Sequence, residues 1–227
     1  SMFTLPCSSE NELSDVILGF SSLSNMSSSF EEVRSVLDFL NERLLRHDTG
    51  RISIDEVSRI MMGMQRMHST HNKVSKVLTN VRAILASHRA EKKEVLAMRN
   101  LATIIYGLQS SSSSDGVVKK LLSELCGIID ESEESSVGVI TGRQLMFCLV
   151  GMQNMDLAHA EVQKLWRILL STLDNSPTRI TRSSIEKSLA ILKKRTDTGG
   201  KSLVEDMERL LHEKITLLNV PVSGAVS

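Results

Sequence analysis

Residues 60–67 read I-M-M-G-M-Q-R-M, residues 104–111 read I-I-Y-G-L-Q-S-S, and residues 148–155 read C-L-V-G-M-Q-N-M. In each stretch an aliphatic run precedes a glycine, then Met or Leu, then glutamine. The glycines follow one another at the same interval of 44 residues (107 − 63 and 151 − 107). A fixed period of this length is typical of repeat proteins, in which each unit is one small supersecondary element that stacks on its neighbours.

A helix start precedes these stretches. Ser53-Ile-Asp-Glu56 and Thr141-Gly-Arg-Gln144 have the sequence of capping boxes, in which the first and fourth residues satisfy each other's backbone N–H groups. Apolar residues five positions apart straddle each box, as in a hydrophobic staple. Thr181 repeats the cap without the Glu or Gln, and Ala97 stands where a capping side chain is missing. The motif therefore predicts the start of one helix in every unit.

The other helix of each unit is marked by an apolar stripe. Apolar residues recur at i, i+3, i+4 and i+7, which is the spacing of one face of an amphipathic helix. The stripes are Val33, Val36, Leu37, Leu40 and Leu44; Val74, Val77, Leu78, Val81, Ile84 and Leu85; Val118, Leu121, Leu122, Leu125, Ile128 and Ile129; and Val162, Leu165, Trp166, Leu169 and Leu173.

Together these patterns predict an all-α fold, namely a superhelical stack of helical hairpins (an α-solenoid of the HEAT or armadillo type). A content of 3% aromatic residues and only three prolines also favours helices. We expect a leading helix near 11–26, helix pairs near 30–67, 71–110, 115–155 and 159–194, and a closing helix near 201–219. In domain terms, residues 1–10 are expected to be a disordered N-terminus that starts with the remnant of a cleaved tag, 11–194 the helical-hairpin repeats of about 44 residues, 195–219 a capping helix and 220–227 a flexible tail.

Gly63, Gly107 and Gly151 are expected in the middle of the second helix of their units. Glycine inside a helix costs about 0.5–1 kcal/mol relative to alanine. The same cost at three equivalent places indicates close helix packing, with another backbone against each glycine. Gln65, Gln109 and Gln153 lie two residues further on, about 200° around the helix. They are interpreted either as hydrogen-bonding residues at the surface or helix end, or as a ladder of ligand-facing side chains in one groove.

Ile60-Met-Met-Gly-Met64 and Ile104-Ile-Tyr-Gly-Leu108 resemble the aliphatic–small–aliphatic stretch of organellar helical-hairpin repeats, such as octotricopeptide-like repeats (OPR). Ile105-Tyr-Gly-Leu-Gln109 and Gly151-Met-Gln-Asn-Met155 are similar to arrays of L-Y-G-L-Q-x-M repeats in proteins of microbial eukaryotes. The resemblance covers residues 15–194. The first group implies RNA binding in mitochondria or plastids, whereas the second implies only an α-solenoid. RNA-binding arrays are usually basic, and this chain departs from them because its formal net charge is zero.

Side chains with catalytic chemistry are sparse. His68 and His71 form an H-x-x-H without a Cys or carboxylate at ligand spacing. Cys126 and Cys148 fall on apolar helix faces, where thiols are usually buried and inert. We therefore expect no catalytic residue, no metal, no cofactor and no small-molecule substrate, and the chain is predicted not to be an enzyme.

Three cysteines without C-x-x-C spacing favour a reduced intracellular setting, cytoplasmic or organellar. No apolar stretch approaches the roughly 20 residues of a membrane span, so no membrane partner is expected.

Charge is uneven along the chain although the sum is zero. Residues 51–100 contain ten Lys and Arg against four Asp and Glu, and residues 1–50 contain three against eight. Such a dipolar surface is interpreted as ordinary solvated helix faces or as a docking patch for an acidic protein segment or RNA phosphate. The candidate basic patch is Arg59, Arg66, Lys73 and Arg82. The function predicted from sequence is a non-catalytic helical-repeat scaffold that binds a protein partner through its groove, with an RNA-binding module of an organellar repeat protein as the alternative.

Overall fold

The computed structural model describes residues 9–91, 95–131, 138–176, 180–195 and 201–218. Within these ranges the chain is all-α, with ten α-helices and no strand. The all-α prediction is thereby confirmed. The first helix starts at Ser9, within the segment expected to be disordered, while residues 1–8 and the predicted tail at 220–227 lie outside the described residues. The helices are α1 (Ser9–Ser22), α2 (Glu31–Leu44), α3 (Ile54–Gly63), α4 (Asn72–Glu91), α5 (Met98–Gly107), α6 (Gly116–Glu131), α7 (Gly142–Gly151), α8 (Ala160–Asp174), α9 (Arg182–Leu192) and α10 (Lys201–Leu218).

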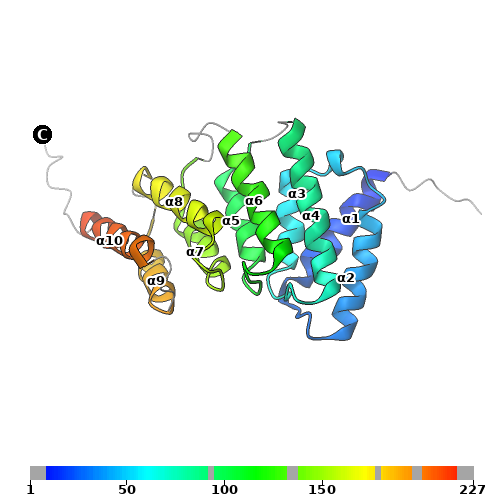
Figure 1. The fold of residues 1–227 in the computed structure, drawn as a ribbon, viewed down its shortest axis with the longest axis horizontal. Coiled ribbons are helices and arrows are strands. Elements are labelled where there is room, and N and C mark those ends of the chain that lie inside the picture. Colours follow the sequence, from blue (N-terminus) through cyan, green and yellow to red (C-terminus); the bar gives the residue numbers. More distant parts are fainter. Residues whose placement is uncertain (1–8, 92–94, 132–137, 177–179, 196–200, 219–227) are drawn as a thin grey trace, which may run out of the picture.

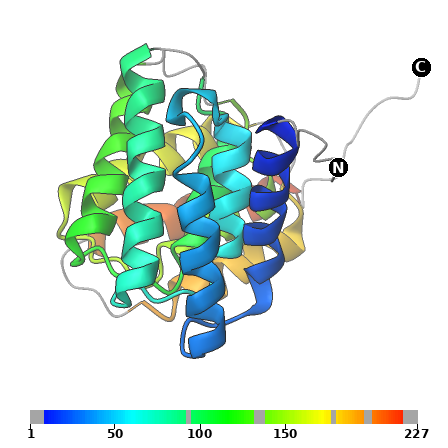
Figure 2. The same ribbon diagram turned by 90° about the vertical axis from the view of Figure 1, so that its right-hand side faces the viewer.

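The helices lie in two layers. The odd layer consists of α1, α3, α5, α7 and α9, and each packs against the next odd helix. The even layer consists of α2, α4, α6, α8 and α10, which pack on one another in the same manner. The two layers are seen side by side in Figure 2, where α2 and α4 lie to the left of α1 and α3. The order along the molecule therefore follows the order along the chain (Figure 1).

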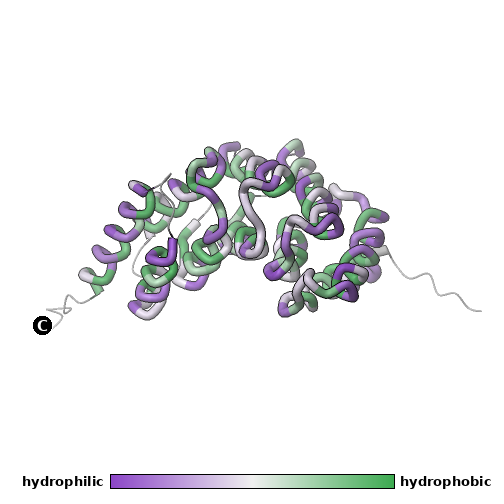
Figure 3. The backbone as a smooth tube through the Cα atoms, turned by 60° about the horizontal axis from the view of Figure 1, so that its bottom comes forward, coloured by the Kyte–Doolittle hydropathy of each residue, from purple (hydrophilic) through white to green (hydrophobic). Residues whose placement is uncertain are grey.

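The row of helices bends into an arch, and polar and apolar positions alternate around each helix (Figure 3). Most residues of the predicted stripes are buried in the core, whereas Val36 is 43% exposed. Leu78, Leu122 and Trp166 are fully or almost fully buried. Burial of one such large side chain contributes about 1.5–3 kcal/mol. The hydrophobic effect therefore holds each even helix onto the odd layer.

The predicted helix starts have the expected hydrogen bonds. The Ser53 N–H donates to the Glu56 carboxylate (2.7 Å), and the Glu56 N–H donates to Ser53 Oγ (3.3 Å). Thr141 and Gln144 repeat this capping box at the start of α7. Thr181 accepts from the backbone of Ser184 without a box, and Ala97 provides no side-chain cap.

The repeated glycines stand at helix ends rather than in helix interiors. Gly63, Gly107 and Gly151 are the last residues of α3, α5 and α7, so the expected interior position was wrong and the cost of glycine inside a helix does not apply. Each glycine lies against the backbone of the preceding odd helix. A Cβ added to Gly107 would stand 2.7 Å from the carbonyl carbon of Met61, and Phe20 and Ile105 are placed likewise against Gly63 and Gly151. Successive odd helices thus meet backbone to backbone near their C-terminal ends.

Candidate binding surface

The odd helices α3, α5, α7 and α9 turn one row of side chains toward solvent. Their second, sixth and ninth residues lie opposite the buried side, because these positions are close together on a helix of 3.6 residues per turn. We call this surface the odd-layer face. In α3, α5, α7 and α9 it consists of Asp55, Arg59 and Met62; Arg99, Thr103 and Tyr106; Arg143, Phe147 and Val150; and Ser183, Lys187 and Ala190, all of them exposed or half-buried.

An aromatic pair lies near the middle of the odd-layer face. The rings of Tyr106 on α5 and Phe147 on α7 are stacked, with centroids 4.3 Å apart and planes 13° from parallel. The Arg143 guanidinium carbon lies 5.1 Å from the centroid of the Phe147 ring, within the range of a cation–π interaction. Because each ring is held by a different helix, the pair forms a fixed apolar platform with a cation beside it.

An ion pair joins two odd helices on the same face. Arg99 Nη2 on α5 donates to both carboxylate oxygens of Asp55 on α3, at 2.9 and 2.8 Å. Both side chains are more than half exposed, so the pair contributes only about 0.2–1 kcal/mol. Its larger effect is on the surface charge, because it neutralises the acidic residue of α3 on this face.

Three cations on the odd-layer face then remain without a carboxylate partner among the described residues. Arg59, Arg143 and Lys187 come from α3, α7 and α9 and are all exposed. Arg182, next to this row, is paired with Glu186 at 2.9 Å. The odd-layer face is therefore basic, although the whole chain is neutral.

The predicted basic patch is divided between the two layers. Arg59 lies on α3 and Arg66 in the turn that follows it, where Arg66 Nη1 donates to the Asn25 carbonyl (3.5 Å). Lys73 and Arg82 lie on α4, in the even layer. Only Arg59 belongs to the odd-layer face, because the sequence segment 51–100 runs through both layers.

Ion pairs join the acidic helix α2 to the basic helix α4. Lys73 Nζ lies 3.4 Å from Glu31 and 3.9 Å from Asp38, and Lys76 Nζ lies 3.7 Å from Asp38. The acidic α2 and the basic α4 therefore face each other. At these positions the opposite charges of α2 and α4 form contacts within the molecule.

The three glutamines do not share one environment. Gln65 is only 8% exposed, and its side-chain amide donates to the Ser24 carbonyl in the turn after α1. Gln109 is half-buried and Gln153 is exposed. The backbone carbonyls of Gln65 and Gln109 accept hydrogen bonds from Ser110 Oγ (3.1 Å) and Asn154 Nδ2 (2.7 Å) of the next unit. Gln65 thus forms a hydrogen bond to the turn after α1 and is turned away from solvent.

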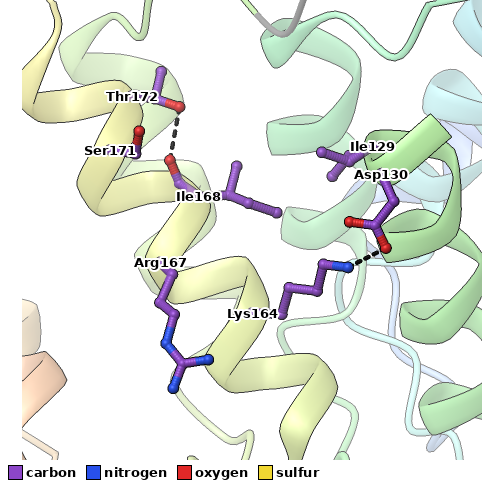
Figure 4. Close-up of a pocket in the computed structure, with 7 residues that line it drawn as sticks. All are labelled: Ile129, Asp130, Lys164, Arg167, Ile168, Ser171 and Thr172. Carbon is purple, nitrogen blue, oxygen red and sulfur yellow. Dashed lines mark hydrogen bonds and ion pairs between the residues drawn. The ribbon is translucent and has the colours of Figure 1, made fainter. Parts of the chain in front are cut away.

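A cleft of about 380 Å³ opens in the even layer between α6 and α8. Figure 4 shows its lining, with Ile129 and Ile168 facing it and Lys164 of α8 reaching across to pair with Asp130 of α6. Thr172 Oγ1 donates to the Ile168 carbonyl at 2.7 Å. Arg167 and Ser171 of α8 complete the lining, and neither side chain forms a hydrogen bond or ion pair with another residue drawn there.

The thiols have the properties of core residues. Burial raises the pKa of the Cys126 thiol to about 11, and burial also raises the pKa of Cys148. Because the thiolate is the nucleophilic form, neither group is activated. His88 Nε2 is 2.6 Å from the Ile52 carbonyl, and His159 Nδ1 is 2.9 Å from Ser113 Oγ. Among the described residues, no three His, Cys, Asp or Glu side chains are grouped so as to hold a metal ion.

None of the described helices is both long enough and apolar enough to cross a membrane. Comparisons with protein-family models, with curated proteins and with solved structures found no match for this chain. The Tyr106–Phe147 pair was not predicted from the sequence, because the repeat pattern relates residues 44 positions apart and these two are 41 apart. Tyr106 is the ninth residue of α5, whereas Phe147 is the sixth residue of α7.

Proposed function

We propose that the chain is an α-solenoid of helical hairpins, of the HEAT, armadillo or octotricopeptide-like type, and that it acts as a non-catalytic scaffold. Its partner is an acidic, extended segment of another protein, which binds along the odd-layer face. The single observation that supports this function most is the row formed by Arg59, Arg143 and Lys187, three exposed cations on the same face as the Tyr106–Phe147 platform.

The chemistry of this row favours a peptide with carboxylates and apolar side chains. Arginine recognises carboxylates through paired hydrogen bonds, and opposite charges across an interface speed association and select partners. Aromatic residues and arginine are also the residue types most often found at the energetic centre of protein interfaces. An acidic segment with an occasional Leu or Phe satisfies both features, since its carboxylates meet the cations while its apolar side chain covers the ring edges.

Single-stranded RNA is the second candidate, because arginines beside aromatic rings also occur where bases stack. Two observations weigh against it. The Phe147 ring is already engaged by Tyr106 and by Arg143, which reduces the ring surface left for a base. The face also has few cations, while RNA affinity depends on many phosphate contacts.

Selection from a library of displayed peptides tests the proposal. The bait is the whole chain, and the counter-bait is the odd-layer variant Arg59→Glu, Arg143→Glu, Lys187→Glu. The matched control reverses three exposed cations of the even layer, Lys119→Glu, Lys120→Glu and Arg167→Glu, so that net charge changes equally. We expect acidic peptides with an apolar residue to be enriched by the wild type and by the control, and to bind the odd-layer variant about tenfold more weakly.

Circular dichroism is recorded on all three proteins, because a fair comparison requires the same helix content. The proposal fails if the enriched peptides bind the odd-layer variant as well as the wild type. It fails equally if the even-layer control loses binding to the same degree, because nonspecific charge attraction then explains the enrichment.

A further inference from the structure

The first even helix exposes a side that the later even helices bury. The sixth residues of α2, α4, α6 and α8 are all apolar, and three of them, Val77, Leu121 and Leu165, are 0% exposed. Val36, the sixth residue of α2, is 43% exposed. The sixth position is therefore buried in α4, α6 and α8 and exposed in α2.

In α4 and α6, contacts of the ninth residue identify the element that covers the side corresponding to the exposed side of α2. Asn80, the ninth residue of α4, donates to Asn41 Oδ1 of α2 at 2.7 Å. Glu124, the ninth residue of α6, pairs with Arg89 of α4 at 3.5 Å. Each contact is with the preceding even helix. Phe39, the ninth residue of α2, is 54% exposed, and no even helix precedes α2 among the described residues.

Phe39 lines a groove. It lies between α1 and α2, has a volume of about 370 Å³, and is lined by Glu12, Asp15, Val16, Phe39, Leu40 and Arg43. In the later even helices, the side that corresponds to the open side of α2 packs against the preceding even helix. We define the open side of α2 together with this groove as the N-terminal groove.

We propose that the N-terminal groove is a docking site for an amphipathic helix with basic flanks, supplied by a protein partner, which lies beside α2 and continues the even layer. The occupant is a helix because helices fill every equivalent position. Its length follows from α2, whose 14 residues span about 21 Å at 1.5 Å per residue. This inference does not depend on the ligand of the odd-layer face.

The charge of the groove selects basic flanks. Asp15 lines it, Glu12 lines it in an ion pair with Arg43, and the exposed Glu32 lies one turn before Val36 on the same side of α2. Arg43 is the one cation of the lining, and it is held by Glu12 at 3.0 Å and lies 4.9 Å from the centre of the Phe39 ring. The molecule already contains this kind of contact, because Lys73 and Lys76 of α4 meet Glu31 and Asp38 of α2.

A synthetic peptide with the sequence of residues 72–91 is a suitable probe. In the intact chain this sequence is α4, which packs its other side against Leu121 and Glu124 of α6, the counterparts of Val36 and Phe39. On that side Arg89 pairs with Glu124 and Glu131 of α6. The peptide therefore presents a cation toward the groove, and Lys73 and Lys76 add positive charge. The labelled peptide is titrated with the whole chain at about 150 mM salt, and fluorescence anisotropy reports binding.

We expect saturable binding that weakens about tenfold or more in Phe39→Glu, which places a charge at the centre of the apolar surface. The matched control is Val139→Glu, because Val139 is similarly exposed (45%) and lies outside the groove. It is expected to bind the peptide like the wild type. Equal binding by Phe39→Glu and the wild type would contradict the proposal.

Tethering the peptide to the chain compensates for the low helix content of a free peptide of this length. Residues 72–91 are joined through a flexible linker to the N-terminus of the chain, which gives an effective concentration on the order of millimolar. We expect slower amide hydrogen exchange in α1 and α2 and a higher melting temperature, both abolished by Phe39→Glu. The absence of both effects overturns the proposal.

Two other occupants give distinct results. A second copy of the chain would appear as a concentration-dependent dimer in sedimentation, dissolved by Phe39→Glu. Residues 1–8 as occupant would appear as a gain of about tenfold in peptide affinity when they are deleted. Either result would assign the N-terminal groove to an occupant other than a partner's helix and would overturn the proposal.

Discussion

The odd and even layers follow the same path through the molecule but are joined in different ways. Odd helices α3, α5 and α7 have ten residues each and meet their predecessors backbone to backbone at glycine. Even helices α2, α4, α6 and α8 have 14 to 20 residues and meet through polar side chains as well as apolar ones, as in the Asn80–Asn41 and Arg89–Glu124 contacts. A backbone contact fixes the distance between two helices, whereas long polar side chains allow it to vary.

The difference has a visible consequence. The cleft of about 380 Å³ between α6 and α8 opens between two even helices. On the odd-layer face, by contrast, stacked rings from two helices remain 4.3 Å apart, which requires a constant helix spacing. A rigid odd layer is the better support for a binding surface, because side chains that are already positioned lose less entropy when a ligand binds.

The largest effect is expected from breaking an odd-layer contact. Gly107→Leu places a side chain against the Met61 carbonyl, and overpacking of this kind destabilises by about 1–3 kcal/mol or more. Urea denaturation followed by circular dichroism measures the loss. Gly116→Ala is the control, because nothing lies within 4 Å of a Cβ added at Gly116, and it should leave the free energy of unfolding nearly unchanged or slightly raised. Equal stability of Gly107→Leu and the wild type would show that the odd helices are not in close contact.

A polar contact in the even layer should cost less. Asn80→Ala removes the donor to Asn41 Oδ1, and Asn41 is only 3% exposed. An unsatisfied buried acceptor costs about 1–3 kcal/mol, and the better helix propensity of alanine returns up to about 0.7 kcal/mol. We therefore expect a net loss of about 1 kcal/mol in the same denaturation assay. A loss larger than that of Gly107→Leu would reverse the proposed order of the two layers.

The smallest effect is expected from the exposed ion pair of the odd layer. A double-mutant cycle with Asp55→Ala and Arg99→Ala should give a coupling energy of about 0.2–1 kcal/mol that decreases at high salt. A coupling above about 2 kcal/mol would mean that this pair, rather than glycine packing, aligns α3 and α5.

Local features of the fold were predictable from the sequence. The capping boxes at Ser53 and Thr141 and the apolar stripes depend on residues within one helix, so spacing alone identifies them. The position of Gly107 at a helix end was not predicted, because the buried turn that follows it contains apolar Leu108 and reads like a continued helix. Helix ends are the least certain part of such a prediction.

The candidate site was less predictable because it joins residues from several helices. Arg59 was singled out from sequence, but Lys73 was grouped with it although the two lie on different layers. The pairing of Tyr106 with Phe147 depends on how far α7 is shifted along α5, and a single sequence does not specify that shift. The same holds for Val36, which has the pattern of a core residue and is open because no even helix precedes α2 among the described residues.

The central claim is that the odd-layer face binds an acidic protein segment, and a paired titration tests it most directly. A peptide enriched in the selection and a single-stranded RNA of about 15 nucleotides, long enough for a typical binding site, are titrated at about 150 mM salt against the wild type and against the variant Arg59→Glu, Arg143→Glu, Lys187→Glu. The account predicts saturable binding of the peptide, lost in the variant, and no submicromolar binding of the RNA. Submicromolar binding of the RNA to the wild type that the variant loses, with no peptide binding, would contradict it.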